Sequence, residues 1–195
     1  MSNQRDLDRR LSLDHLARLL DLERIELDVF RAPNPGAEGG RLFGGQVASQ
    51  ALRAAQLTVE ADHEVHSVHS FFLRPGRYGV PILLRVDRIR DGKSFSTRRV
   101  VAWQRGEAIF NLDASFHRLE DGPEFALPAP ADTPPPEEVP RAERWGPHHD
   151  PLDTREIDLG DAPARRVWFK TVAALPDDPG IHACVITYAT DMGPM

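Results

Sequence analysis

Two adjacent glycines and a glutamine, Gly44, Gly45 and Gln46, open an alanine-rich segment that continues to Leu57. Small apolar residues recur in this segment at helical spacing, which predicts a helix that packs closely against a sheet. The first N–H groups of a helix have no partner within the helix and carry partial positive charge. Glycine leaves these groups uncovered, which favours a helix start that another molecule approaches closely. The alternative is that the glycines serve only tight packing or a loop with positive φ.

Two histidines, His66 and His69, lie in an apolar segment of strand type, residues 65–73. Residues three apart in a regular strand point to opposite faces, so this pair is not expected to bind one metal ion. His66 is one of two candidates for a catalytic group and is expected to face a substrate groove. The alternative is that both histidines are ordinary strand residues with hydrogen-bond partners.

Asp191 is the other catalytic candidate, at the end of an apolar run, residues 181–190, that is predicted to be a strand. The pattern places Asp191 where a following helix would start. A carboxylate at this position can take a proton from a water molecule, which is general-base chemistry. An Asp before a helix is also a common N-cap, so a purely structural role is the alternative.

The elements that position these residues follow from the pattern of apolar residues and turns. A strand is predicted at 25–30, then a Pro/Gly-rich loop, the helix from residue 44, and antiparallel strands at 65–73, 81–90, 94–105 and 107–118. This order predicts an α+β fold in which an antiparallel sheet wraps round one helix. Residues 119–144 are rich in proline and are predicted to be an extended linker, after which strand-like segments resume at 155–159, 165–173 and 181–190.

The composition argues against several classes of function. The formal net charge of -6 makes a nucleic-acid partner unexpected, because a phosphate backbone requires clustered positive charge. No apolar run of signal-peptide type opens the chain, and no segment is long and apolar enough to span a bilayer. The single cysteine, Cys184, is compatible with a reducing compartment. We therefore expect a soluble cytoplasmic protein without a metal site, nucleic-acid partner or membrane attachment.

Four segments resemble the acyl-CoA thioesterase II (TesB-like) family. They are FGGQVASQALRAAQ at residues 43–56, VHSVHSFFLRPG at 65–76, VPILLRVDRIRDGKSFSTRRVVAWQRGEAIFNLDASF at 80–116 and HACVITYATDM at 182–192. The resemblance implies a double hotdog, in which each hotdog is an antiparallel sheet wrapped round one helix. It also implies hydrolysis of fatty acyl-CoA to free fatty acid and CoA, with no cofactor.

The resemblance further implies how the chain is divided. The family places an Asp, a Thr and a Gln around the attacking water, and the Asp matches Asp191, whereas the Thr and the Gln would lie beyond Met195. We therefore expect a complete hotdog at 10–118, a linker at 119–144 and the start of a second hotdog at 145–195. About seventy residues of that second copy would be absent, so this chain by itself is expected to be weakly active or inactive.

A substrate that carries several phosphates gives the basic residues of the chain a role. Arg88 and Lys93 flank the Asp91-Gly92 pair, a typical hairpin turn, and are expected to bind CoA phosphates at a basic rim that also includes Arg90, Arg98 and Arg99. The alternative is an exposed charged hairpin without a ligand. Gly44, Gly45 and Gln46 would then face the acyl-CoA at the helix start.

Two other functions are compatible with the same fold. A hotdog-type enoyl-CoA hydratase requires an Asp and a His paired on one segment, and no His lies within the next few residues after Asp191. A non-catalytic acyl-CoA-binding fragment or module requires neither group. The open edge of a hotdog sheet also predicts a homo-oligomer.

Overall fold

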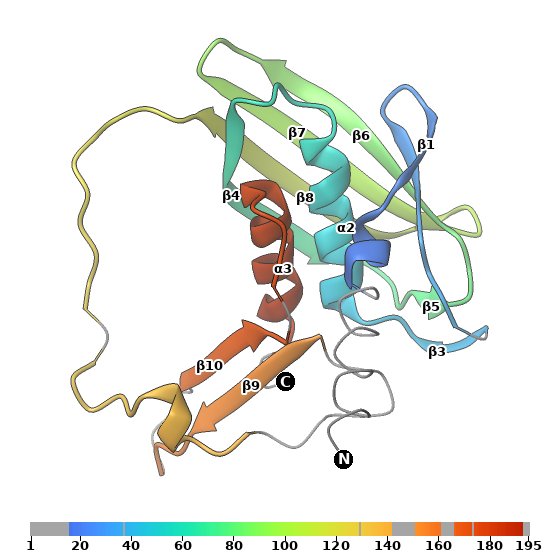
Figure 1. Ribbon diagram of the computed structural model, residues 1–195. Helices are drawn as coiled ribbons and strands as arrows, with labels where there is room; N and C mark the ends of the chain where they lie inside the picture. Colours follow the sequence, from blue (N-terminus) through green and yellow to red (C-terminus); the bar gives the residue numbers. More distant parts are fainter. Residues whose placement is uncertain are drawn as a thin grey trace. The chain divides into compact units, whose positions relative to one another are not determined.

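The computed structural model describes residues 16–36, 38–128, 130–141, 151–160, 166–172 and 174–192 (Figure 1). The chain divides into two compact units. The larger unit holds residues 17–120 together with 175–195, and the smaller unit holds residues 1–16 and 121–174. Residues 16–20 are helical.

The larger unit contains a six-stranded antiparallel sheet, as predicted. Its strands, in spatial order, are β1 (Glu23–Glu26), β2 (Val29–Ala32), β6 (Ile82–Asp91), β7 (Phe95–Gln104), β8 (Glu107–Arg118) and β4 (His63–Phe72). Apolar residues alternate along the strands, so one face is buried; Val100 of β7 pairs with Leu112 of β8, and neither is exposed. A separate pair joins β3 (Gly39–Arg41) and β5 (Arg77–Tyr78).

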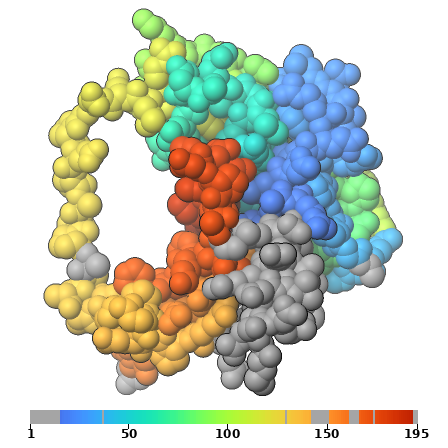
Figure 2. Space-filling view, in the orientation of Figure 1, coloured from blue at the N-terminus to red at the C-terminus, as the bar shows by residue number. Residues whose placement is uncertain are grey.

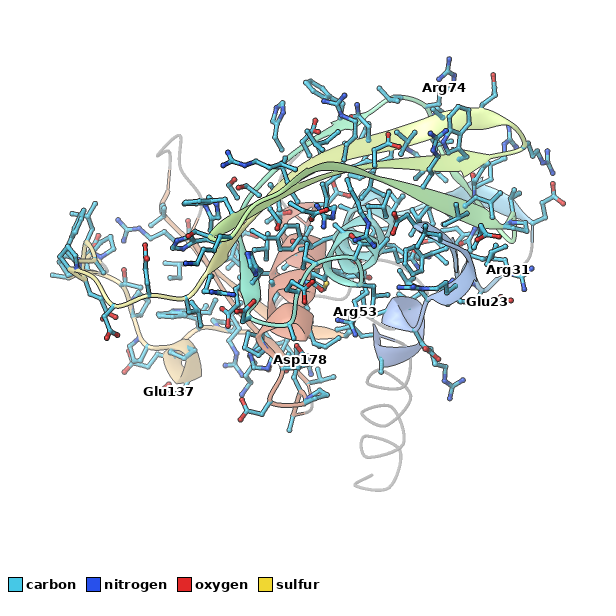
Figure 3. All side chains as sticks on the ribbon, turned by 90° about the horizontal axis from the view of Figure 1, so that it is seen from above. Glu23, Arg31, Arg53, Arg74, Glu137 and Asp178 are labelled. Carbon is cyan, nitrogen blue, oxygen red and sulfur yellow. The ribbon has the colours of Figure 1, made fainter. Side chains whose placement is uncertain are left out.

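The prediction of a single strand at 25–30 is wrong, because the chain reverses within this segment to form the β1–β2 hairpin. Asp28 in the turn has φ of 58°, a left-handed conformation that Asp tolerates better than most residues. Arg88 of β6 donates two hydrogen bonds to the Asp28 carboxylate, at 2.8 and 2.9 Å, and these lower the pKa of Asp28. A second ion pair, in which Arg31 Nε donates to Glu23 at 2.8 Å, joins the two strands (Figure 3).

The helix α2 (Gly44–Gln56) begins where the sequence predicts and packs against one face of the sheet (Figure 1). Ala51, Ala54 and Ala55 on its buried side have no exposed surface and share a core with Phe110 and Leu112 of β8. Alanine side chains let the helix backbone lie close to the strands, which is the packing that the small residues indicated.

The segment 181–190, predicted to be a strand, is instead a helix, α3 (Pro179–Thr190). Its N-terminus carries two local signals that the prediction of a strand left out of account. Asp178 is the N-cap, whose carboxylate accepts from the N–H groups of Gly180 and Ile181 at 2.8 and 3.3 Å, and Pro179 follows at the first helical position. The β-branched residues within the segment favour a strand only weakly, and tertiary packing overrides that preference.

Helices α2 and α3 lie side by side and run antiparallel (Figure 1). Near the end of α2, Gln56 Nε2 donates to the carbonyl oxygen of Gly180 at 3.0 Å, and Cys184 Sγ donates to Gln56 Oε1 at 3.3 Å. Burial raises the pKa of the Cys184 thiol to about 12, because a low-dielectric environment disfavours the thiolate. Cys184 is therefore a neutral packing residue and not a candidate nucleophile.

A buried arginine fastens the C-terminal end of α2 to the sheet. Arg98 of β7 is 1% exposed; its Nε donates to Thr58 Oγ1 at 2.8 Å and its Nη2 to the Thr58 carbonyl at 2.9 Å. Its Nη1 donates to the carbonyl oxygens of Arg90 and Thr97, and its Nη2 also pairs with the Asp91 carboxylate. Thr58 follows α2, so the guanidinium also lies near the negative end of that helix.

We expect Arg98→Met to lower the free energy of unfolding by about 3 kcal/mol or more, because buried carbonyl oxygens lose their donor. Arg99→Met is the matched control: Arg99 is half exposed, and its ion pair with Asp113 should contribute little to stability because solvent screens it. Urea unfolding followed by circular dichroism measures both changes. Equal losses for the two variants would show that burial of Arg98 does not matter.

The smaller unit contains an antiparallel hairpin of β9 (Leu152–Ile157) and β10 (Arg166–Thr171). The described residues of the predicted linker include a turn at 131–132 and one short 3₁₀ helix, η1 (Pro136–Glu138). Arg155 of β9 donates to the carbonyl oxygens of Pro136 and Val139 at 2.7 and 3.0 Å, so part of the linker is fixed to the hairpin. None of the helices in the described part of the chain has both the length and the apolar character to cross a membrane.

Candidate active site

The end of α3 meets the start of α2 at a carboxylate. Asp191 directly follows α3, and its Oδ2 accepts a hydrogen bond from the backbone N–H of Gly45 at 2.9 Å. The two residues are 146 positions apart in the chain. Asp191 follows a helix and not the predicted strand: it is the C-cap of α3, and the helix whose N-terminus it contacts is α2.

The N-terminus of α2 depends on this contact, because it has no cap of its own. Phe43 occupies the N-cap position without a side-chain hydrogen bond, and the first turn contains no acidic residue. The N–H donors and the dipole of a helix N-terminus attract a negatively charged group such as a carboxylate. Within the described part of the chain only Gly45 donates to Asp191, which leaves Oδ1 to accept a proton.

The two glycines are required for the close approach of the helices. A Cβ atom on Gly44 would lie 2.6 Å from Asp191 Oδ2 and 2.6 Å from Cε1 of Phe72. A Cβ atom on Gly45 would lie 2.3 Å from the carbonyl oxygen of Tyr188 and 2.5 Å from the Phe43 ring. Tight packing, one of the two roles considered for these glycines, is thus present; contact with acyl-CoA stays a prediction.

Aromatic rings that the sequence pattern did not single out lie beside Gly44 and Gly45. Phe43 and Tyr188 meet edge to face, with ring centroids 4.9 Å apart. Phe72 of β4 is half exposed, and its ring centroid lies 5.1 Å from that of the buried Phe110. Phe43 and Phe72 each stand beside a motif residue, but their sequence pattern is that of core positions, so only their proximity to Asp191 distinguishes them.

Gln46 is directed away from Asp191. Its side chain is 3% exposed, and its Nε2 lies 3.4 Å from the carbonyl oxygen of Pro33 in the loop that precedes α2. Gln50, one turn further along, donates to the same carbonyl at 2.7 Å. The described contacts of Gln46 therefore hold the loop, and its predicted role in binding substrate is not tested by them.

The two histidines do not approach Asp191. His66 Nε2 lies 2.9 Å from Ser115 Oγ of β8, and its ring contacts His117. His69 lies opposite Asp113 in the pairing of β4 with β8. The expectation that the histidines face opposite sides is wrong, because a bulge between Val65 and Ser67 shifts the alternation and leaves both on the face away from α2. His66 is also six residues, or about 20 Å, along β4 from Phe72.

The predicted basic rim lies at the other end of α2. Arg88 pairs with Asp28, Arg98 is buried beside Thr58, and Lys93 is exposed in the turn between β6 and β7. Since α2 has 13 residues, this end is about 20 Å from Gly45. Contact of Arg88 or Lys93 with CoA phosphates stays a prediction. The described residues include no group of three or more His, Cys, Asp or Glu arranged to hold a metal ion.

Comparison with known proteins fits this geometry. Residues 32–117 match the family model of the acyl-CoA thioesterase N-terminal domain. Acyl-CoA thioesterase 2 of Haemophilus influenzae is 32% identical over 202 residues, which cover 92% of this chain and 70% of that protein. The chain belongs to the acyl-CoA thioesterase family. An acyl-CoA thioesterase II (TesB2) structure from Mycobacterium marinum matches with a TM-score of 0.77 and 36% identity, over 91% of this chain and 67% of that one.

Further relatives match the chain over only part of their own length or share only its fold. Acyl-coenzyme A thioesterase 8 of Homo sapiens is 43% identical over 124 residues, 62% of this chain, but only 38% of that protein is matched. The present chain thus spans well under half the length of some curated relatives that it matches. A structure from Alicyclobacillus acidocaldarius described as having a hot dog fold matches with a TM-score of 0.73 at 19% identity, which supports the hotdog fold predicted above.

Proposed function

We propose that this protein is an acyl-CoA thioesterase that hydrolyses fatty acyl-CoA with a water molecule activated by Asp191. The hydrogen bond from Gly45 N–H to Asp191 Oδ2 carries the proposal, because it joins the two motifs of the family resemblance into one site. Asp191 alone would be an ordinary helix end, and Gly44-Gly45 alone an ordinary helix start. A carboxylate beside backbone N–H donors supports the proposal, because thioester hydrolysis requires a general base and donors for the oxyanion.

The reaction follows from this arrangement. Asp191 Oδ1 takes a proton from water while the water oxygen bonds to the thioester carbonyl carbon, and the carbonyl oxygen becomes an oxyanion. The N–H group of Gly44, the first residue of α2, is assigned to stabilise this negative charge. Collapse of the intermediate breaks the carbon–sulfur bond, and the leaving CoA sulfur takes the proton from Asp191. The products are a fatty acid and CoA, and Asp191 is ionised again.

The direct test measures release of the CoA thiol. Purified protein is incubated with a series of acyl-CoA esters, and free thiol is followed with a thiol-reactive chromophore. We expect weak but saturable thiol release that depends on Asp191. Saturable binding of acyl-CoA without thiol release would favour a non-catalytic acyl-CoA-binding module instead. Hydration of an enoyl-CoA is disfavoured because His66 and His69 lie on the opposite face of the sheet from α2, and His63, the third histidine of β4, contacts Asp62 at the end of the strand that is far from Phe72.

Three further features belong to the same proposal. The division into a hotdog at 10–118, a linker and a second hotdog from residue 145 is kept as the proposed organisation of the family fold. A homo-oligomer is proposed because β4, ten residues long, forms one edge of the six-stranded sheet. The cytoplasm is proposed as the location, supported by the single cysteine, which is buried as a free thiol.

A further inference from the structure

The face of β4 that looks towards the helices carries exposed apolar side chains. Val68 and Ser70 lie opposite the buried residues Ala114 and Leu112 of the neighbouring strand β8. They are therefore on the helix side of the sheet, as is Phe72. Phe72 is 54% exposed and Val68 is 40% exposed. We call the side chains of Phe72, Ser70 and Val68 the β4 strip.

The β4 strip begins at the candidate base. Gly44 packs against both Asp191 Oδ2 and Cε1 of Phe72, each 2.6 Å from the position that a Gly44 Cβ would take, so the carboxylate and the ring are neighbours. A thioester carbon placed beside Asp191 would therefore have the Phe72 ring as its neighbour. In Figure 2 the surface of α3, in red, adjoins that of β4, in teal, so the strip lies in the same unit as the carboxylate.

The chemistry of the strip matches an alkyl chain. It has no ionisable side chain, and the small Ser70 lies between the two larger apolar residues. Exposed contiguous apolar surface commonly marks a binding site in a soluble protein. From Phe72 to Val68 the strand rises about 13 Å, which corresponds to an extended acyl chain of about ten carbons. Beyond Val68 the bulge at Val65–Ser67 interrupts the face.

We propose that the β4 strip binds the acyl chain of a medium-chain acyl-CoA, with Phe72 beside the thioester and Val68 at the distal end. The proposal rests on the thioesterase function proposed above, since Asp191 fixes where the chain begins. Val68 then determines how strongly the enzyme discriminates between chains that reach it and chains that do not. A four-carbon chain ends near Phe72, whereas a ten-carbon chain contacts Val68.

The test introduces one charge on each face of the same strand. Val68→Glu places a carboxylate on the strip, and Ser67→Glu places it on the opposite face one residue away. We expect the ratio of kcat/KM for decanoyl-CoA to that for butanoyl-CoA to fall about tenfold or more in Val68→Glu, because contact with several methylene groups is lost. The ratio should be unchanged in Ser67→Glu. Both positions are exposed, and circular dichroism verifies that both variants fold.

Binding measured without turnover separates this proposal from the proposed function. Calorimetric titration of decanoyl-CoA and butanoyl-CoA into Asp191→Asn, with and without Val68→Glu, gives the dissociation constants. The enzyme could be active while its ratio of kcat/KM for decanoyl-CoA to that for butanoyl-CoA stays unchanged in Val68→Glu, or changes equally in Ser67→Glu. Either result overturns the proposal that the β4 strip binds the acyl chain and leaves the thioesterase function intact. If Val68→Glu loses decanoyl-CoA binding but the parent protein hydrolyses no acyl-CoA, the β4 strip binds the acyl chain and the proposed thioesterase function is refuted.

Discussion

Asp191→Asn lowers kcat for acyl-CoA hydrolysis by about a hundredfold to ten-thousandfold, with a small effect on acyl-CoA binding. The asparagine carbonyl oxygen can still accept from Gly45 N–H, so the contact between the helices is kept. The amide cannot take a proton from water, so only the chemical step is lost. Steady-state thiol release gives kcat, and calorimetric titration of acyl-CoA gives the dissociation constant.

Asp178→Asn is the matched control for this substitution. Asp178 is also a carboxylate at a helix terminus, where it accepts from Gly180 N–H and Ile181 N–H, and it lies at the far end of α3 from Asp191 (Figure 3). Asparagine is an equally good N-cap, so stability and kcat should both stay close to those of the parent protein. If Asp191→Asn turns over normally while His66→Ala is inactive, the assignment of the base to Asp191 is wrong.

Gly45→Ala lowers the free energy of unfolding by about 2 to 3 kcal/mol, the second large effect that the structure predicts. The added Cβ would lie 2.3 Å from the backbone carbonyl oxygen of Tyr188, and a backbone atom cannot move unless α3 shifts as a whole. Urea unfolding measures the loss. Gly122→Ala is the control, because no atom lies within 4 Å of the position that its methyl group would take, and a change close to zero is expected.

Gly44→Ala should separate stability from activity. Its Cβ meets the ends of two side chains, Asp191 Oδ2 and the Phe72 ring, which can rotate away. We therefore expect a smaller loss of stability than for Gly45→Ala but a clear loss of kcat, because the carboxylate is displaced from the helix start. Unchanged stability in Gly45→Ala would show that the two helices do not pack as closely as the structure has them.

Local patterns in the sequence predict most of the sheet and the first helix. The alternation of apolar residues in 81–118 and the Asp91-Gly92 turn predict three antiparallel strands, all of which are present. The alanines after Gly45 predict a helix against a sheet, and α2 is that helix. These features are decided within a few residues, by side-chain alternation, turn chemistry and small-residue spacing, so a single sequence carries them.

Errors arise where a local preference is weak or a contact is distant. The turn at Asp28 depends partly on Arg88, 60 residues away, and the bulge that turns His66 towards the outer face depends on pairing with β8. The helical state of 179–190 has a local signal in Asp178-Pro179, but packing against α2 outweighs the β-branched residues. Such preferences are worth fractions of a kcal/mol per residue, less than the burial of one side chain.

The sequence by itself determined which residues carry the family's motifs, including Gly44, Gly45 and Asp191. Only the tertiary structure decided that these residues meet. Helix α2 lacks a cap of its own, and its unpaired N–H groups require an acceptor. Antiparallel packing of α3 delivers that acceptor from 146 residues away, and two glycines without side chains are what allow the helices to come close enough. No pattern within a short window can encode this contact, because it exists only when both helices are folded and packed.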